Sequence, residues 1–141
     1  MYTSSVSARL ILHPLAGEKR AGALVQVVEG LYREGRRVVI WVADEGRRQL
    51  LDDYLWTFKK LSFLPHAMWQ PGMDEPVEPV ILAGEPDDAI AAEVLAVGDE
   101  IPPAEWAATF SEVHDFVPPG AAGEERTKRW REAGLLPDRE G

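Results

Sequence analysis

The residues with the clearest chemical potential form a basic cluster near the end of the chain. Four cations and a tryptophan occupy six positions, Arg126-Thr127-Lys128-Arg129-Trp130-Arg131. Because charged donors hydrogen-bond carboxylates and phosphates strongly, this cluster could receive an acidic peptide or a phosphate group. It also has a structural interpretation, in which the helix dipole favours cations near a helix C-terminus and Trp130 docks the helix onto a sheet. Composition alone leaves both interpretations open.

Large apolar side chains gather in a second cluster, between residues 54 and 69. Tyr54 fits the apolar stripe of the helix expected there, whereas Trp56 lies about 200° further round the helix and cannot share that face. Either the proline-rich segment that follows folds back over Trp56, or Trp56 is an exposed anchor for a partner, because large apolar patches often mark interfaces. Both could hold for different edges of one patch.

The turn after the first apolar run argues against a nucleotide site. It reads His13-Pro14-Leu15-Ala16-Gly17-Glu18-Lys19-Arg20 and has neither glycine-rich phosphate-binding pattern. Glu18 would also repel a phosphate at the start of the following helix. The three histidines, His13, His66 and His114, are far apart in sequence and have no second metal ligand nearby. We therefore expect no cofactor, no metal and no catalytic residue, with a small nucleotide-binding α/β module or enzyme as the alternative.

Length and charge are those of one acidic domain. The chain has 141 residues, of which 45% are hydrophobic, no cysteine, and a net charge of −9. We expect a single domain over residues 1–141, with a disordered tail from about residue 135. No Lys or Arg occurs between Lys60 and Arg126, so DNA contact is expected to be indirect at most. The chain has no run of 18 apolar residues and no cationic leader, which predicts a cytoplasmic protein that does not contact membranes.

Alternating periodicities predict the elements that must position these residues. Short apolar runs predict strands over residues 7–13, 37–43, 77–83, 93–97 and 112–117, and spacings of three and four predict helices over 18–32, 45–58 and 123–133. Alanines leave a helix as the alternative for residues 88–96. Prolines between residues 71 and 79 predict a loop. The pattern indicates an α/β fold, a Rossmann-like three-layer sandwich with a mostly parallel sheet and helices on both faces.

Two motifs resemble the signature of the chi subunit of bacterial DNA polymerase III. They read Leu51-Asp52-Asp53-Tyr54-Leu55-Trp56-Thr57-Phe58 and Ser62-Phe63-Leu64-Pro65-His66. Residues 35–40 with Asp44-Glu45 are similar to the family's second strand and acidic turn, residues 110–118 to its last strand, and residues 126–134 to its arginine-rich C-terminal helix. The resemblance spans nearly the whole chain in order.

The resemblance implies a non-catalytic accessory subunit of a DNA-directed DNA polymerase complex, in which the clamp loader is linked to single-stranded DNA-binding protein. In the family, the C-terminal helix receives the acidic, phenylalanine-ended tail of that binding protein. This role carries over to Lys128 and Arg131, with Arg126 and Trp130 beside them. Two positions depart from the pattern, because Glu124 stands where the family can place an arginine and Thr127 where it can place an aromatic residue. The resemblance therefore predicts a weaker or rearranged tail site.

The second surface that the resemblance implies binds the psi subunit or, alternatively, a repair helicase. It falls on Trp56, Phe63, Leu64 and Pro65. Under this interpretation the tryptophan that does not fit its helix face has a protein partner.

Overall fold

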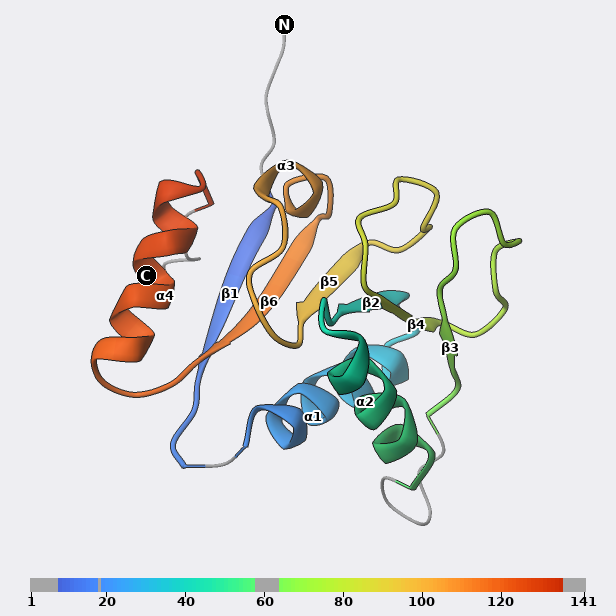
Figure 1. The fold of residues 1–141 in the computed structure, drawn as a ribbon, viewed down its shortest axis with the longest axis horizontal. Coiled ribbons are helices and arrows are strands. Elements are labelled where there is room, and N and C mark those ends of the chain that lie inside the picture. Colours follow the sequence, from blue (N-terminus) through green and yellow to red (C-terminus); the bar gives the residue numbers. More distant parts are fainter. Residues whose placement is uncertain (1–7, 18, 58–63, 136–141) are drawn as a thin grey trace, which may run out of the picture.

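The computed structural model describes residues 8–17, 19–57 and 64–135 and has a parallel six-stranded sheet between two covering layers (Figure 1). The strand order is β1-β6-β5-β2-β4-β3, and every neighbouring pair is parallel. The strands are β1 (Arg9–Pro14), β2 (Val38–Trp41), β3 (His66–Met68), β4 (Val80–Ala83), β5 (Val94–Val97) and β6 (Glu112–Val117). The helices are α1 (Arg20–Arg33), α2 (Glu45–Thr57), α3 (Ala104–Ala107) and α4 (Ala121–Glu132).

Helices α1 and α2 cover one face of the sheet (Figure 1). Their apolar side chains recur at spacings of three and four, so each helix presents one continuous stripe to the strands. Together with the strand residues that point to the same side they form one core cluster: Leu24, Val25, Val28, Leu31, Leu51, Leu55, Val38, Ile40, Val80, Leu82, Val94 and Phe116 among others.

The opposite face is covered by the later part of the chain, namely α3, α4 and the segments that follow β3 and β4. Side chains that alternate with those of the first core point this way, among them Val39, Trp41, Ile81, Leu95 and Val113. All four residues of β2, of β4 and of β5 are buried, as expected for strands covered on both sides. The predicted α/β sandwich with helices on both faces is confirmed.

Most predicted elements are present, with small shifts at their ends. Residues 94–97 form β5 and not the alternative helix, and residues 71–76 contain no helix or strand, as predicted. The strand predicted from residue 77 begins only at Val80, because Pro79 has no N–H to donate to a neighbouring strand. Helix α1 ends one residue later than expected and α4 begins two residues earlier, while residues 7, 18 and 58 of the predicted elements lie outside the described residues. Strand β1 extends to Pro14, which is tolerated because β1 is at the edge of the sheet.

Two short elements were not predicted. Strand β3 has three residues and pairs with β4 alone, and α3 is a single turn that follows Pro103. Segments of this length are too short to establish a periodicity, so the prediction missed them. Leu135, placed by the prediction at the start of a tail, is buried in the core beside α4.

Candidate functional site

The basic cluster is organised by a buried carboxylate on β6. Asp115 is fully buried and accepts hydrogen bonds from Trp130 Nε1 at 2.7 Å, from Arg126 Nε at 2.6 Å and from Arg20 Nη1 at 3.1 Å. A charge out of contact with water is tolerated only where it is paired and hydrogen-bonded, and here two guanidinium groups and an indole N–H do both. Asp115 therefore fastens α4 and the start of α1 to the sheet.

Arg20 and Arg126 meet at this carboxylate from opposite layers. Arg20 also donates to the carbonyls of Val97 and Phe116, and Arg126 donates to the carbonyl of Asp99. Burial, followed by repulsion from Arg126, lowers the pKa of Arg20, and the attraction of Asp115 opposes this shift. The role of both arginines in the structure is to satisfy Asp115.

The structure divides the four predicted tail-binding residues into two pairs. Arg126 and Trp130, four residues apart, point at the sheet, and Trp130 is fully buried. Lys128 and Arg131 are exposed, and no acidic partner is assigned to either within the described ranges. They lie three residues apart on the same side of the helix. We call this side, which carries Glu124, Thr127, Lys128 and Arg131, the outward face of α4.

A shallow groove of about 400 Å³ runs along the outward face of α4. Its lining comes from the end of β6 and from the helix: Val117, Pro118, Gly120, Gly123, Glu124, Thr127 and Arg131. The helix approaches the preceding loop so closely that a Cβ on Gly123 would lie 1.9 Å from the Pro118 carbonyl oxygen. Glycine is therefore required at this position, and the groove combines apolar walls with one cation and one carboxylate.

The second predicted surface is only partly described. Trp56 is 55% exposed, and its ring centroid lies 4.6 Å from that of His66. His66 is buried, with Nδ1 2.8 Å from the Leu64 carbonyl oxygen and Nε2 3.0 Å from Asp52 Oδ1. Leu64 itself is buried in the core, Pro65 is half-buried, and Phe63 lies outside the described residues. Of the described members of this surface, Trp56 is the one that a partner could contact over a large area.

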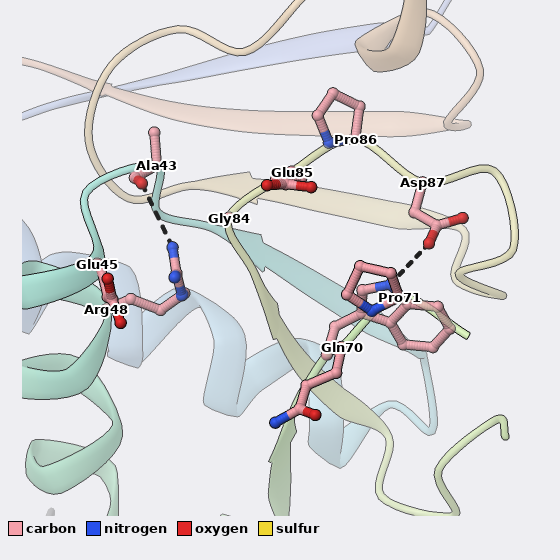
Figure 2. A pocket seen from close by; sticks show the side chains of 10 residues that line it. Ala43, Glu45, Arg48, Gln70, Pro71, Gly84, Glu85, Pro86 and Asp87 are labelled. Carbon is pink, nitrogen blue, oxygen red and sulfur yellow. Dashed lines mark hydrogen bonds between the residues drawn. The ribbon is translucent and has the colours of Figure 1, made fainter. Parts of the chain in front are cut away.

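A third location was missed by sequence reasoning, a crevice of about 420 Å³ beyond the ends of β2 and β4 (Figure 2). These neighbouring strands continue into segments on opposite faces of the sheet, the position where α/β proteins commonly bind ligands. Here the space is partly filled by Arg48, whose Nη1 donates to the Val42 carbonyl at 2.8 Å. A Cβ on Gly84 would lie 1.8 Å from that nitrogen, so the glycine makes room for the guanidinium.

Carboxylates dominate the rim of this crevice. Glu45, Glu85 and Asp87 line it (Figure 2). The Ala89 backbone N–H and then Trp69 Nε1, which is 2.9 Å from Asp87 Oδ2, lower the pKa of Asp87 and keep it ionised. Three carboxylates repel a phosphate, which argues on electrostatic grounds against the nucleotide-binding alternative. Gly84, which directly follows β4, was the sequence signal for the close approach of the Arg48 guanidinium to the backbone.

The fold also joins two histidines that are far apart in sequence. His13 Nε2 is 2.9 Å from His114 Nδ1, the rings stack, and His114 Nε2 is 3.0 Å from Glu112 Oε1. Burial is the main cause that lowers the pKa of both histidines. Within the part of the chain that the structure describes, no group of three or more His, Cys, Asp or Glu side chains could hold a metal ion. In the same part, none of the helices has the length and apolar character needed to cross a membrane.

Comparison with known proteins assigns the family. The model of the family described as DNA polymerase III chi subunit, HolC, matches residues 9–135, which include the whole sheet and α4. The chain belongs to this family. Membership implies an accessory role in DNA replication and agrees with the resemblance seen in the two sequence motifs.

Two curated relatives carry the family's name. A DNA polymerase III subunit chi from Escherichia coli is 32% identical over 108 residues, which cover 74% of this chain and 73% of that protein. The corresponding protein of Pseudomonas aeruginosa is 34% identical over 61 residues, 43% of this chain, and the match spans less than half, 42%, of that relative. Among solved structures, the C-terminal domain of a Sulfolobus solfataricus SWI2/SNF2 ATPase gives a TM-score of 0.53 at 12% identity, over 83% of this chain and 57% of the other. That likeness concerns the fold alone.

Proposed function

We propose that this chi-family chain is a non-catalytic subunit of the DNA polymerase III clamp loader that links the replicative polymerase to single-stranded DNA-binding protein. It would act in the cytoplasm at the replisome as one domain, and it would reach DNA through its partners. Family membership supports the replication role. The observation that carries the link is the pair of exposed cations, Lys128 and Arg131, for which the described part of the structure gives no acidic partner.

The tail of the binding protein would lie along the outward face of α4. Its acidic side chains and terminal carboxylate would pair with Lys128 and Arg131, because charge-assisted hydrogen bonds to carboxylates are the strong ones. The terminal phenylalanine ring would enter the groove between Val117 and Thr127. Arg126 and Trp130, which point inward to Asp115, act as positioning residues that hold this face in place.

Glu124 and Thr127 would set the strength of this contact. Glu124 lines the groove and repels the acidic tail, whereas Thr127 supplies a small side chain whose hydroxyl donates to the Gly123 carbonyl at 2.9 Å. Neither offers the cation or the aromatic wall that the family can place there. We therefore expect saturable binding of the tail in the micromolar range, dependent on salt because the ion pairs are at the surface.

Titration of a labelled peptide with the acidic, phenylalanine-ended tail tests the proposal. A copy that lacks the final phenylalanine should not bind, because it has neither the ring nor a carboxylate in the right place. Arg131→Ala should weaken binding by about 1–3 kcal/mol. The matched control is Arg129→Ala, since Arg129 is an exposed arginine of the same helix that already pairs with Glu125 at 3.4 Å. Equal affinity for both peptides, or equal loss in both variants, would contradict the site.

The Trp56 surface is proposed as the second contact, with a psi-like clamp-loader subunit as the partner. A repair adaptor that works with a helicase at the same surface is the alternative function. The supporting observation is a tryptophan that is 55% exposed although its ring already packs on His66. Tryptophans in such positions are frequent binding hot spots. Phe63, Leu64 and Pro65 would complete or support the contact.

Binding assays with each purified partner separate the two alternatives at this surface. Trp56→Ala should reduce binding of the true partner more than tenfold and leave the tail titration unchanged. Gln49→Ala is the control, because Gln49 is an exposed residue on an earlier turn of the same helix. If the Trp56→Ala variant still bound both partners with unchanged affinity, Trp56 would not be part of a binding surface for either.

A further inference from the structure

An apolar groove lies between α1 and α2. These two helices cover the face of the sheet opposite to α4 (Figure 1). Its volume is about 330 Å³. Buried side chains form the floor, namely Leu24, Val42 and Leu51, and the walls include Leu50 and Tyr54. Leu50 is 68% exposed and Tyr54 is 38% exposed. Leu50 is not part of the core, but it lies beside a groove whose floor is apolar.

Two arginines border this apolar groove. Arg20 is held rigidly at one edge by Asp115 and by two backbone carbonyls, and its side chain is 21% exposed. Arg47 is in the first turn of α2 and is exposed. The helix dipole disfavours a cation in the first turn, so helix stability does not account for Arg47.

The Arg47 guanidinium also has no assigned acidic partner within the described ranges, although its backbone N–H donates to Asp44 Oδ2. Arg20 shares Asp115 with Arg126, and the charge of Asp99 also attracts Arg20. The border of the groove is consequently cationic while its floor is apolar, and the pattern complements an apolar side chain flanked by acidic residues.

We propose that the α1–α2 groove binds a short acidic segment of a partner protein, with one bulky apolar side chain inserted between Leu50 and Tyr54 and neighbouring carboxylates directed at Arg47 and Arg20. The segment is internal to its protein, because the two cations are at the edges of the groove and suit side-chain carboxylates on either side of the anchor. This site is separate from the outward face of α4 and from Trp56, which lies on another side of α2, and it does not depend on the proposed tail site.

A labelled peptide that cannot use the tail site provides the test. The probe is fluorescein-labelled Asp-Glu-Leu-Phe-Asp-Glu with an amidated C-terminus, titrated into the full chain and followed by anisotropy. Amidation removes the terminal carboxylate on which the proposed α4 contact depends. We expect saturable 1:1 binding, and no binding of the same peptide with lysine in place of its acidic residues.

Three variants locate the probe. Arg47→Glu and Leu50→Asp should each weaken binding by about tenfold or more, since one reverses the charge at the border and the other places a carboxylate at the apolar wall. Both residues are exposed, so the variants should fold, which a thermal melt verifies. Arg131→Glu is the matched control and should leave the affinity within about twofold. Arg20 is not varied because its removal would leave Asp115 short of a partner.

The outcomes separate this site from the tail site. Absence of binding to wild type, or binding that Arg47→Glu and Leu50→Asp leave unchanged, overturns the groove proposal whatever the tail titration shows. Loss of the amidated probe in Arg131→Glu also overturns it, because the peptide would then be on α4. A failed tail titration with retained binding of the amidated probe overturns the proposed link and leaves the groove proposal standing.

Discussion

The inward and outward faces of α4 use the same residue types for different purposes. Arg126 and Trp130 point inward and share Asp115, a carboxylate with no exposure to water. Lys128 and Arg131 point outward, next to a groove that contains no cation other than Arg131. A cation whose partner is already in the fold contributes to stability, whereas a cation whose partner is absent is available for binding. Side-chain composition does not distinguish the two roles, but the location of the acceptor does.

The largest loss of stability is expected from a substitution that disrupts the inward face. Asp115→Ala removes the acceptor shared by two arginines and an indole and should lower the free energy of unfolding by about 3–5 kcal/mol, because charges are left unpaired in the interior. Urea denaturation measures the change. Glu124→Ala, which removes an exposed carboxylate from the first turn of α4 on the outward face, should lower the value by no more than about 1 kcal/mol. Similar losses in the two variants would erase the distinction between the faces.

A smaller effect should follow from removing one donor to the same carboxylate. Trp130→Phe keeps an aromatic ring in the core but deletes the N–H that lies 2.7 Å from Asp115 Oδ2. The expected loss of stability is about 1–3 kcal/mol, since a buried charged acceptor loses a hydrogen bond. Denaturation midpoints give this value. Tail affinity measured below the transition should stay within about twofold of wild type, and a large loss of affinity would place Trp130 in the binding contact.

A substitution on the outward face should increase affinity for the tail. Glu124→Arg replaces the carboxylate in the groove with a cation and should raise affinity for the acidic tail about tenfold. The same change removes an acid from the first turn of α4, which should cost about 0.3–1 kcal/mol of stability. Titration and thermal melting of one sample measure both. Unchanged affinity in a protein that responds to Arg131→Ala would mean that the tail does not reach Glu124.

The smallest effect is expected at the histidine pair, where a substitution should change the pH dependence of stability but not tail binding. Burial lowers the pKa of His13 and of His114 below 6.5 in the folded state. As pH falls below about 6.5, the unfolded chain binds more protons than the folded one, so the free energy of unfolding falls with falling pH until the lowered values are passed. His114→Asn should reduce that slope by an amount on the order of 1 kcal/mol per pH unit.

Denaturation at a series of pH values measures this slope. Besides burial, the hydrogen bond and charge of Glu112 raise the pKa of His114, whereas the charges of Arg36 and Arg9 lower it. The proposed tail contact at Lys128 and Arg131 contains no histidine and should keep its affinity. An unchanged slope in the variant would contradict the role of the histidine pair.

Sequence patterns were sufficient for most of the sheet and insufficient for the orientation of α4. Strands β2, β4 and β5 were predicted because residues buried on both sides give continuous apolar runs. Strand β3 was missed because its three residues at an edge give no recognisable pattern. The basic cluster was recognised as a group, but its division into two pairs depends on Asp115, a residue on a strand that comes earlier in the chain.

Helical spacing contained part of that information. Arg126 and Trp130 are four residues apart and Lys128 and Arg131 are three apart, so each pair shares a face. Docking of Trp130 onto the sheet was one of the two interpretations that the sequence left open, and its contact with Asp115 decides between them. The crevice at Gly84 and the histidine pair were missed because each joins residues from separate strands or loops.

The proposed tail site can be tested by following backbone amide shifts in a ¹⁵N spectrum of the full chain as the acidic, phenylalanine-ended peptide is added. We expect the largest shifts at Val117, Thr127, Lys128 and Arg131, with small shifts on the strands beneath α4. Shifts confined to the α1–α2 groove or to the crevice at Arg48, or no shifts at saturating peptide, would contradict the assignment of the outward face of α4 as the tail site.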